Sequence, residues 1–141
     1  MDTAKAVKAA LARNQGREGA LLPILHDVQD ALGHIPRAAV PEIASALNLS
    51  RAEVHGVVTY YHHFREEPSH GPVLQICRAE ACQSMGGDAL WEHAKTLTGC
   101  EVEATYCLGL CASSPAAMLG DRLLARLTPE RLDERLQALL R

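Results

Sequence analysis

Four of the five cysteines in this 141-residue chain fall into two close pairs. Cys77 and Cys82 form a C-x4-C pair, and Cys107 and Cys111 form a C-x3-C pair farther along the chain. Thiolates are the ligands that soft transition metals prefer, and two loops that each supply two thiolates can complete a four-coordinate site. The spacing therefore predicts a metal centre built from both pairs.

Iron–sulfur and zinc sites both use four thiolates, so the metal needs a further argument. Zinc knuckles most often use C-x2-C turns, and neither pair has this form. Small residues near the second pair, such as Gly109, Ala112 and Ser113, would let backbone N–H groups approach the sulfurs and share the charge of a cluster. We expect one [2Fe–2S] cluster, with zinc or simply buried cysteines as the alternatives. The fifth cysteine, Cys100, is expected to pack in the core.

The composition limits the class of protein. Hydrophobic residues make up 48 % of the chain and aromatic residues 4 %, so Leu and Ala must fill most of the core. A formal charge of −3 and a pI near 6.1 argue against a protein that wraps nucleic acid. We find no apolar run long enough for a membrane span and no secretory signal. We expect a cytoplasmic protein with reduced thiols, no nucleic-acid partner and no direct membrane contact.

The first part of the chain has the apolar spacing of short helices. We predict that the helices cover residues 4–13, 21–32, 41–47 and 50–64. Gly33 and Asn48 are expected as left-handed stops, and Ser50 opens the last helix through an S-x-x-E capping box. Tyr61 is placed on the inward stripe of that helix. Residues 1–67 should therefore form a helical bundle, which we interpret as a docking module.

Beyond a linker at residues 68–72 the pattern changes to short strands and helices. The expected elements are a strand over 73–77, a helix over 86–97 with Gly99 as its cap, a strand over 101–106, a hairpin over 116–127 and a helix from Thr128 to the end. Cys82 would lie just before the first of these helices, and Tyr106 would face inward. The sequence thus predicts an α+β chain, with an α/β domain over 72–141 that holds both cysteine loops.

At these residues the chain resembles the thioredoxin-like [2Fe–2S] ferredoxin subunits of NADH-linked oxidoreductases. The similarity covers both cysteine pairs, the Leu21-Leu22-Pro23-Ile24-Leu25-His26 segment, the Val57-Val58-Thr59-Tyr60-Tyr61 run and the Ala112-Ser113-Ser114-Pro115 run. It implies a thioredoxin-like domain in which one [2Fe–2S] cluster is ligated by Cys77, Cys82, Cys107 and Cys111. It also implies an electron-transfer subunit without a catalytic site of its own. Pro115 would take the proline position beside the cluster, and a cis bond there is a hypothesis.

The segment from Cys77 to Gly86 is most similar to the gamma subunits of NAD-dependent formate dehydrogenase. Small subunits of complex I more often have Thr and Pro between these cysteines. The alternative assignments are a small subunit of complex I and a subunit of an NAD-reducing hydrogenase. The resemblance implies a partner subunit that carries FMN, NAD(H) and iron–sulfur clusters, and a larger molybdenum- or iron–sulfur-containing subunit. The segment Gly99–Tyr106 is shorter than is usual in the family, which affects the expected edge of the sheet.

Residues 43–61 also match a helix-turn-helix, with Arg51 and His55 as candidate base contacts. No lysine lies in this helical pair and several glutamates surround it, which disfavours DNA binding. A zinc-stabilised or redox-sensing helix-turn-helix interaction module is the alternative of a different class. His62 and His63 are adjacent and would point about 100° apart on a helix, so we expect a surface or interface role for the histidines rather than a metal site.

Two charged residues, Arg78 and Glu80, lie between the cysteines of the first pair. A charge in this position would tune the potential of a cluster. The alternative is an ordinary solvated pair of charges in a loop. The sequence leaves these two interpretations equally open.

Overall fold

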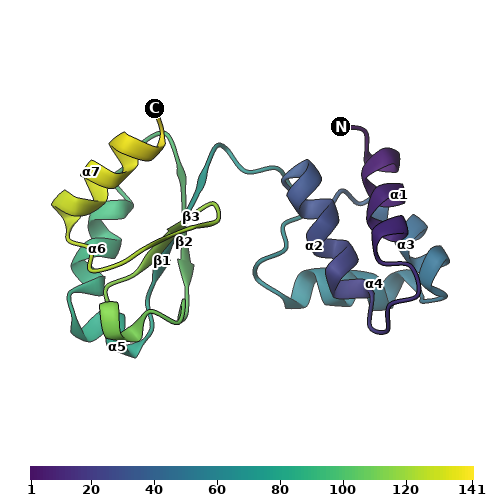
Figure 1. Cartoon of the computed structure of the whole chain (residues 1–141), viewed down its shortest axis with the longest axis horizontal. Helices are drawn as coiled ribbons and strands as arrows, with labels where there is room; N and C mark the ends of the chain where they lie inside the picture. The colour runs from purple at the N-terminus through teal and green to yellow at the C-terminus, as the bar shows by residue number, and fades with distance from the viewer. The chain divides into compact units, whose positions relative to one another are not determined.

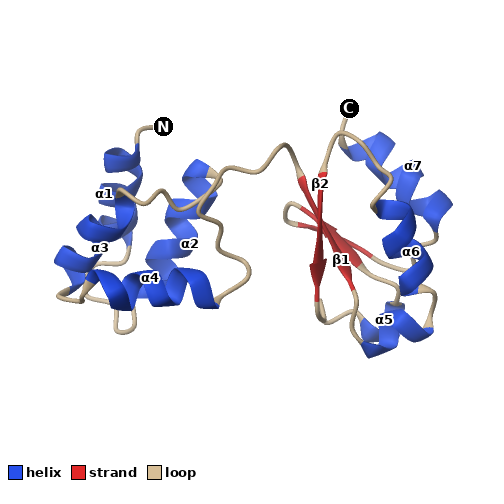
Figure 2. Cartoon of the chain, turned by 180° about the vertical axis from the view of Figure 1, so that it is seen from behind, coloured by secondary structure: helices blue, strands red, loops and turns tan.

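The fold was obtained as a computed structural model that describes the whole chain, from Met1 to Arg141 (Figure 1). The chain divides into two compact units, Met1–Ser69 and His70–Arg141. The first unit is built from helices alone, whereas the second contains a four-stranded sheet (Figure 2). None of the helices is both long and apolar enough to cross a lipid bilayer.

The helical unit contains α1 (Thr3–Arg13), α2 (Leu21–Leu32), α3 (Ala39–Leu47) and α4 (Arg51–Tyr60). The helix ends follow local chemistry. Gly33 and Asn48 take left-handed conformations with φ of 80° and 55°, as expected. The Ser50 hydroxyl accepts the Glu53 backbone N–H at 3.0 Å, and the Glu53 carboxylate accepts the Ser50 N–H at 2.7 Å. The predicted capping box is therefore present.

α4 is shorter than predicted, because it ends at Tyr60 rather than near Phe64. Tyr61 has an extended backbone, with φ −85° and ψ 118°, and this breaks the helix. The chain then turns so that Phe64 enters the core with 7 % exposure. The inward placement of Tyr61 was wrong, since its side chain is 42 % exposed. Its ring lies edge-on to that of Phe64, with 6.0 Å between the centroids.

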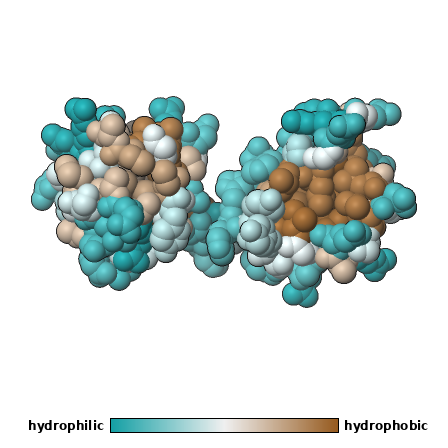
Figure 3. Space-filling view, turned by 90° about the horizontal axis from the view of Figure 1, so that it is seen from below, coloured by the Kyte–Doolittle hydropathy of each residue, from teal (hydrophilic) through white to brown (hydrophobic).

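The core of the helical unit is formed by aliphatic side chains from all four helices. The largest fully buried side chains of this core, including Ile35 between α2 and α3, are Val7, Ile24, Leu25, Val28, Ile35, Ile43 and Val54. Gln29 is also buried, and it fixes the segment after α4: its amide nitrogen donates to the His63 carbonyl at 2.7 Å, and its amide oxygen accepts the Arg65 N–H at 2.8 Å. Further hydrophobic residues gather on an outer face of this unit (Figure 3).

The second unit is a mixed sheet with strand order β2-β1-β3-β4. Its strands are β1 (Val73–Cys77), β2 (Glu101–Thr105), β3 (Ala117–Leu119) and β4 (Arg122–Leu124). β1 is parallel to β2 and antiparallel to β3, so that Ile76 faces Ala104 on one side and Ala117 on the other. β3 and β4 form the predicted hairpin.

The helices of this unit are α5 (Glu80–Ser84), α6 (Gly87–Ala94) and α7 (Pro129–Leu139), and a 3-10 turn covers Cys111–Ser113. α6 and α7 cover the same face of the sheet (Figures 1 and 2). Leu74 from β1, Leu90 from α6 and Leu132 from α7 are fully buried in the core between these layers. The imidazole of His93 and the carboxylate of Asp133, 2.7 Å apart, join α6 to α7.

Three expectations for this unit were wrong, and one helix was missed. The helix predicted over 86–97 ends at Ala94, and Gly99 lies beyond it with φ 89° instead of capping it. Tyr106 is 70 % exposed rather than inward, because it follows an edge strand of the sheet. The short helix α5, between the cysteines of the first pair, was not predicted.

Candidate metal centre

The sheet brings the two cysteine pairs to the same end of neighbouring strands. β1 ends at Cys77, whose partner in the parallel β2 is Thr105, two positions before Cys107. Parallel strands run in the same direction, so the loops that leave them begin at the same sheet edge. The parallel pairing requires a crossover, which here consists of α5 and α6. The topology therefore explains why pairs separated in the sequence converge.

The two cysteine loops are in direct contact. The Cys107 backbone N–H donates to the Cys77 sulfur at 3.3 Å. The sulfurs of Cys107 and Cys111 are 3.7 Å apart. The Cys77 and Cys82 thiols also interact with each other, and the charge of Cys77 acts on both Cys82 and Cys111. The structure thus gathers the four cysteines that the sequence singled out into two facing pairs.

The pairs differ in their exposure to solvent. Cys77 and Cys82 are buried, with exposures of 2 % and 3 %, and form a small apolar cluster with Ala116. Cys107 and Cys111 are exposed. The site therefore has a buried half and an open half.

The pKa values of the two buried thiols, Cys77 and Cys82, are shifted in opposite directions. Burial opposes ionisation of Cys77, but the N–H groups of Ala79, Cys107 and Leu108, with the Cys82 thiol, lower its pKa below the ordinary value. Burial raises the pKa of Cys82, and the charge on Cys77 raises it further. In this pair the first thiolate forms at Cys77. In the open pair, the neighbouring Cys107 thiol raises the pKa of Cys111.

The second loop contains unusual backbone conformations. Cys107 and Gly109 both have positive φ, 74° and 76°. A Cβ at Gly109 would meet no atom within 4 Å, so the glycine is explained by its left-handed conformation and not by a lack of space near the sulfur. A non-glycine residue with such a φ carries strain of about 1–3 kcal/mol, and strain of this kind gathers at functional sites.

The first loop is packed closely against α6. Cys82 precedes α6, as expected, but it lies inside α5, a short helix that was not predicted. A Cβ on Gly87, the first residue of α6, would stand 2.5 Å from the Cys82 carbonyl oxygen. No side chain can be accommodated there unless the backbone moves. Gly87 thereby allows α6 to begin directly against a site cysteine.

Arg78 extends from this loop toward α6. Its guanidinium lies 4.9 Å from the centre of the Trp91 ring, and Nη2 is 3.6 Å from the Asp88 carboxylate. Glu80 is exposed at the start of α5. The structure therefore does not show the solvated Arg78–Glu80 pair.

Cys100 and the candidate histidines have contacts of their own. Cys100 is partly buried against the sheet core, as expected, and burial raises the pKa of its thiol. His55 pairs with Glu66 at 3.5 Å, and the His63 ring contacts His26 with 5.1 Å between centroids. No three His, Cys, Asp or Glu side chains converge on a position for a single metal ion. The Ser114–Pro115 bond is cis, as hypothesised, while the position of Pro115 beside a cluster stays a prediction.

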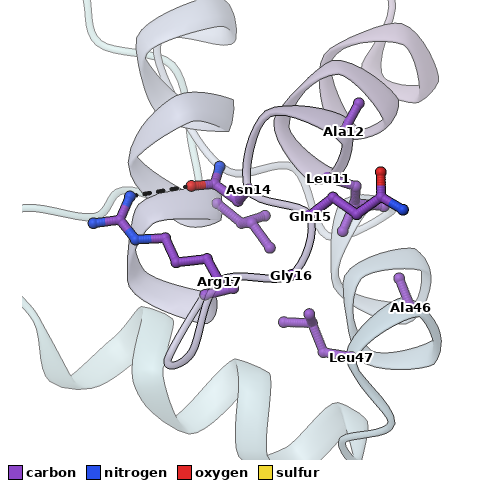
Figure 4. A pocket seen from close by; sticks show the side chains of 10 residues that line it. Leu11, Ala12, Asn14, Gln15, Gly16, Arg17, Ala46 and Leu47 are labelled. Atoms are coloured by element: carbon purple, nitrogen blue, oxygen red, sulfur yellow. Dashed lines mark hydrogen bonds between the residues drawn. The ribbon is translucent and has the colours of Figure 1, made fainter.

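The structure also contains several cavities. One of about 360 Å³ in the helical unit is lined by residues from α1, α2, α3 and the turn after α1 (Figure 4). Leu11 and Leu47 form part of its wall, and Arg17 donates to the Asn14 side-chain oxygen at 3.4 Å. Its lining contains no thiol, imidazole or carboxylate, so it offers no group suited to acid–base or metal chemistry.

The cysteines fit an iron–sulfur cluster by their chemistry. They provide four thiol donors from two loops, Ala79 and Ala116 pack against the buried pair together with Leu108 and Leu110, and a backbone N–H already points at the Cys77 sulfur. Hydrogen bonds of this kind are the means by which proteins stabilise cluster sulfurs.

Comparison with known proteins identifies the family. Residues 7–140 match the family described as thioredoxin-like [2Fe-2S] ferredoxin. The chain belongs to this family. Its fold is accordingly the expected thioredoxin-like ferredoxin fold, a mixed sheet with flanking helices.

Relatives of the ferredoxin chain are subunits of larger assemblies. It is 31 % identical to a NADH-quinone oxidoreductase subunit of Rhizobium meliloti, with 94 % of this chain and 85 % of that protein covered. It is 27 % identical to the alpha subunit of the NAD-reducing hydrogenase HoxS of Cupriavidus necator, of which it covers only 23 %, over 91 % of its own length. A solved chain of an NAD+-reducing [NiFe]-hydrogenase in the H2-reduced state matches with a TM-score of 0.65 and 25 % identity. That match covers 84 % of this chain and 22 % of the solved one.

Proposed function

We propose that this ferredoxin is the [2Fe–2S] electron-transfer subunit of an NAD-linked, flavin-containing oxidoreductase complex. The observation that carries the proposal is the meeting of two cysteine pairs at one sheet edge, where the Cys107 N–H donates to the Cys77 sulfur. The family membership and the names of the relatives support it.

The ligands in this proposal are Cys77, Cys82, Cys107 and Cys111. A bound [2Fe–2S] cluster exchanges single electrons. Cys77 and Cys82, which are buried, would hold one side of the cluster, and Cys107 and Cys111, which are exposed, would hold the other. The N–H of Cys107 stabilises negative charge on the Cys77 sulfur. The division into two pairs suits a binuclear centre, since each iron needs two protein thiolates.

The names of the relatives support the existence of partner subunits. We propose a cytoplasmic complex in which another subunit carries FMN and NAD(H) and a larger subunit carries molybdenum or further iron–sulfur clusters. The residues from Cys77 to Gly86 favour the gamma subunit of an NAD-dependent formate dehydrogenase. Complex I and NAD-reducing hydrogenase, which the relatives' names support directly, are the alternatives. In each, residues 72–141 would hold the cluster and residues 1–67 would dock to a partner.

Anaerobic reconstitution tests the cluster. The wild-type chain should take up about two irons and two acid-labile sulfides and give a rhombic EPR signal after reduction. Cys107→Ser should abolish or cripple the cluster, whereas Cys100→Ser should leave the signal nearly unchanged, because Cys100 packs in the sheet core. A wild-type chain that binds zinc but no iron or sulfide would refute the proposal. Bleaching by Cys100→Ser alone would refute the ligand assignment.

Isolation of the complex from its native source tests the narrower assignment. When the complex is purified through a tag on this chain, we expect it to contain molybdenum and FMN and to catalyse the formate-dependent reduction of NAD+. NADH-dependent reduction of quinone, or hydrogen-dependent reduction of NAD+, would instead assign the chain to one of the alternatives.

A further inference from the structure

The side chain of Arg78 joins the first cysteine loop to α6. Its guanidinium lies 4.9 Å from the centre of the Trp91 ring and 3.6 Å from the Asp88 carboxylate. A guanidinium plane is suited to stacking on an indole while its edge pairs with a carboxylate. The Arg78 side chain is 33 % exposed and that of Asp88 is 68 % exposed, so the stack on the indole is partly shielded from solvent while the ion pair is largely solvated. Arg78 thus makes two contacts with one helix.

The backbone of Arg78 is held as well. Its N–H donates to the Thr105 carbonyl at the end of β2, at 2.8 Å. Its carbonyl accepts the side-chain amide of Gln83 in α5, at 2.7 Å. One residue therefore connects the ends of β1 and β2 with α5 and, through its side chain, with α6.

α5 needs such an anchor, because it has only five residues. A helix this short is not stable without tertiary contacts. It carries Cys82, whose carbonyl lies against Gly87, directly before Asp88. Arg78 therefore contacts α6 at Asp88, next to Gly87, where the Cys82 carbonyl packs against the same helix.

We propose that Arg78 is a positioning residue that clamps the Cys77–Cys82 loop onto α6 and keeps these two thiols buried and together. The inference rests on the proposed function in that the two thiols are the buried half of the cluster site. Arg78 acts through the loop and α6, and it is not itself a ligand.

Lys95 provides a matched control. Its ammonium lies 5.8 Å from the centre of the same Trp91 ring and pairs with Glu92 at 2.8 Å, within one helical turn. Lys95→Gln removes a cation from the same indole but leaves every contact between the cysteine loop and α6 in place. Arg78→Gln removes both the cation and the clamp, and Arg78→Lys keeps the charge without the planar stack.

The test is peptide-resolved alkylation of the full-length apo protein. Cys107 and Cys111 are exposed and should react quickly in every variant, whereas Cys77 and Cys82 should react slowly in the wild type because they are buried. Loss of the stacking and the ion pair should raise the alkylation rate of Cys82 about tenfold in Arg78→Gln, through local opening. Arg78→Lys should show a smaller increase, and Lys95→Gln should match the wild type.

Equal Cys82 rates in Arg78→Gln and wild type would overturn the clamp. An equal increase at Cys100, in the sheet core, would also overturn it, because the effect would then be general unfolding and not release of the loop. In the reconstituted protein, a chelator should remove iron faster from Arg78→Gln than from Lys95→Gln. If no protein, wild type included, takes up iron and sulfide, the proposed function fails, and the alkylation rates still decide the clamp.

Discussion

Gly87→Ala is the most informative single change outside the cysteines. The new methyl group would stand 2.5 Å from the Cys82 carbonyl oxygen and 2.8 Å from its carbonyl carbon. Both atoms belong to backbone, so they cannot swing aside as the end of a flexible side chain can. Overpacking of this kind costs about 1–3 kcal/mol. Either α6 moves away from α5, or the loop that carries Cys82 is displaced.

The higher helix propensity of alanine partly offsets the cost of this clash. Alanine is favoured over glycine within a helix by about 0.5–1 kcal/mol, and less at the first position of a helix. The clash is larger than this gain, so the net loss in the free energy of unfolding should be about 1–2 kcal/mol. For a unit of this size, that corresponds to a fall in melting temperature of about 4–8 °C for each kcal/mol.

Urea unfolding followed by the fluorescence of Trp91, the single tryptophan of the chain, measures this loss in the second unit. The denaturation midpoint should fall while the slope stays that of the wild type. Gly56→Ala in α4 is the matched control, since its Cβ would meet no atom within 4 Å. Followed by circular dichroism, it should stabilise the helical unit slightly. A Gly87→Ala midpoint equal to or above the wild-type value would refute the close-packing argument.

Two further predictions concern the helical unit. The Ser50 N–H, and then its hydroxyl, hold the pKa of Glu53 below its ordinary value of 4.5, so the capping box stabilises the folded state fully above that pH and less as the pH falls through the lowered pKa. Ser50→Ala keeps the backbone N–H and removes the hydroxyl, so it should raise the Glu53 pKa part of the way toward 4.5 in an NMR titration and flatten the acid side of the stability profile; an unchanged pKa would contradict this. Gln29→Leu removes both hydrogen bonds from its side chain to the backbone of His63 and Arg65. It should lower the free energy of unfolding, measured in urea, by about 2–3 kcal/mol. A loss below about 0.5 kcal/mol would show that water replaces the amide there.

The sequence was sufficient to predict features that depend on local chemistry. The capping box at Ser50 and the left-handed stops at Gly33 and Asn48 are encoded within a few neighbouring residues. The cysteine pairs could be singled out in the same way, because spacing and residue type carry that signal.

Features set by tertiary packing could not be predicted. Tyr61 and Tyr106 fit the apolar pattern of their elements, yet both are exposed, because one lies where α4 breaks and the other follows an edge strand. α5 is too short to leave a periodic pattern. The difference in burial between the two cysteine pairs, and the left-handed backbone of Cys107, arise only when the strands and loops meet. The role of Gly87 could have been suspected from the Gly86-Gly87 pair, but nothing local indicates which atom it faces.

The central position of β1 has a consequence for how the protein is made. Both neighbours of this strand, β2 and β3, come later in the chain, and the parallel pairing with β2 needs a closed crossover. Contacts between segments so distant in sequence form late and slowly, whereas the preceding helices can pack on each other as they emerge. During synthesis, the first two thiols therefore leave the ribosome before the other two exist in the folded chain. Cys77 and Cys82 stay accessible to a wrong metal or an oxidant until the sheet closes. The time that this takes, and not the reactivity of the thiols, determines how long they are accessible.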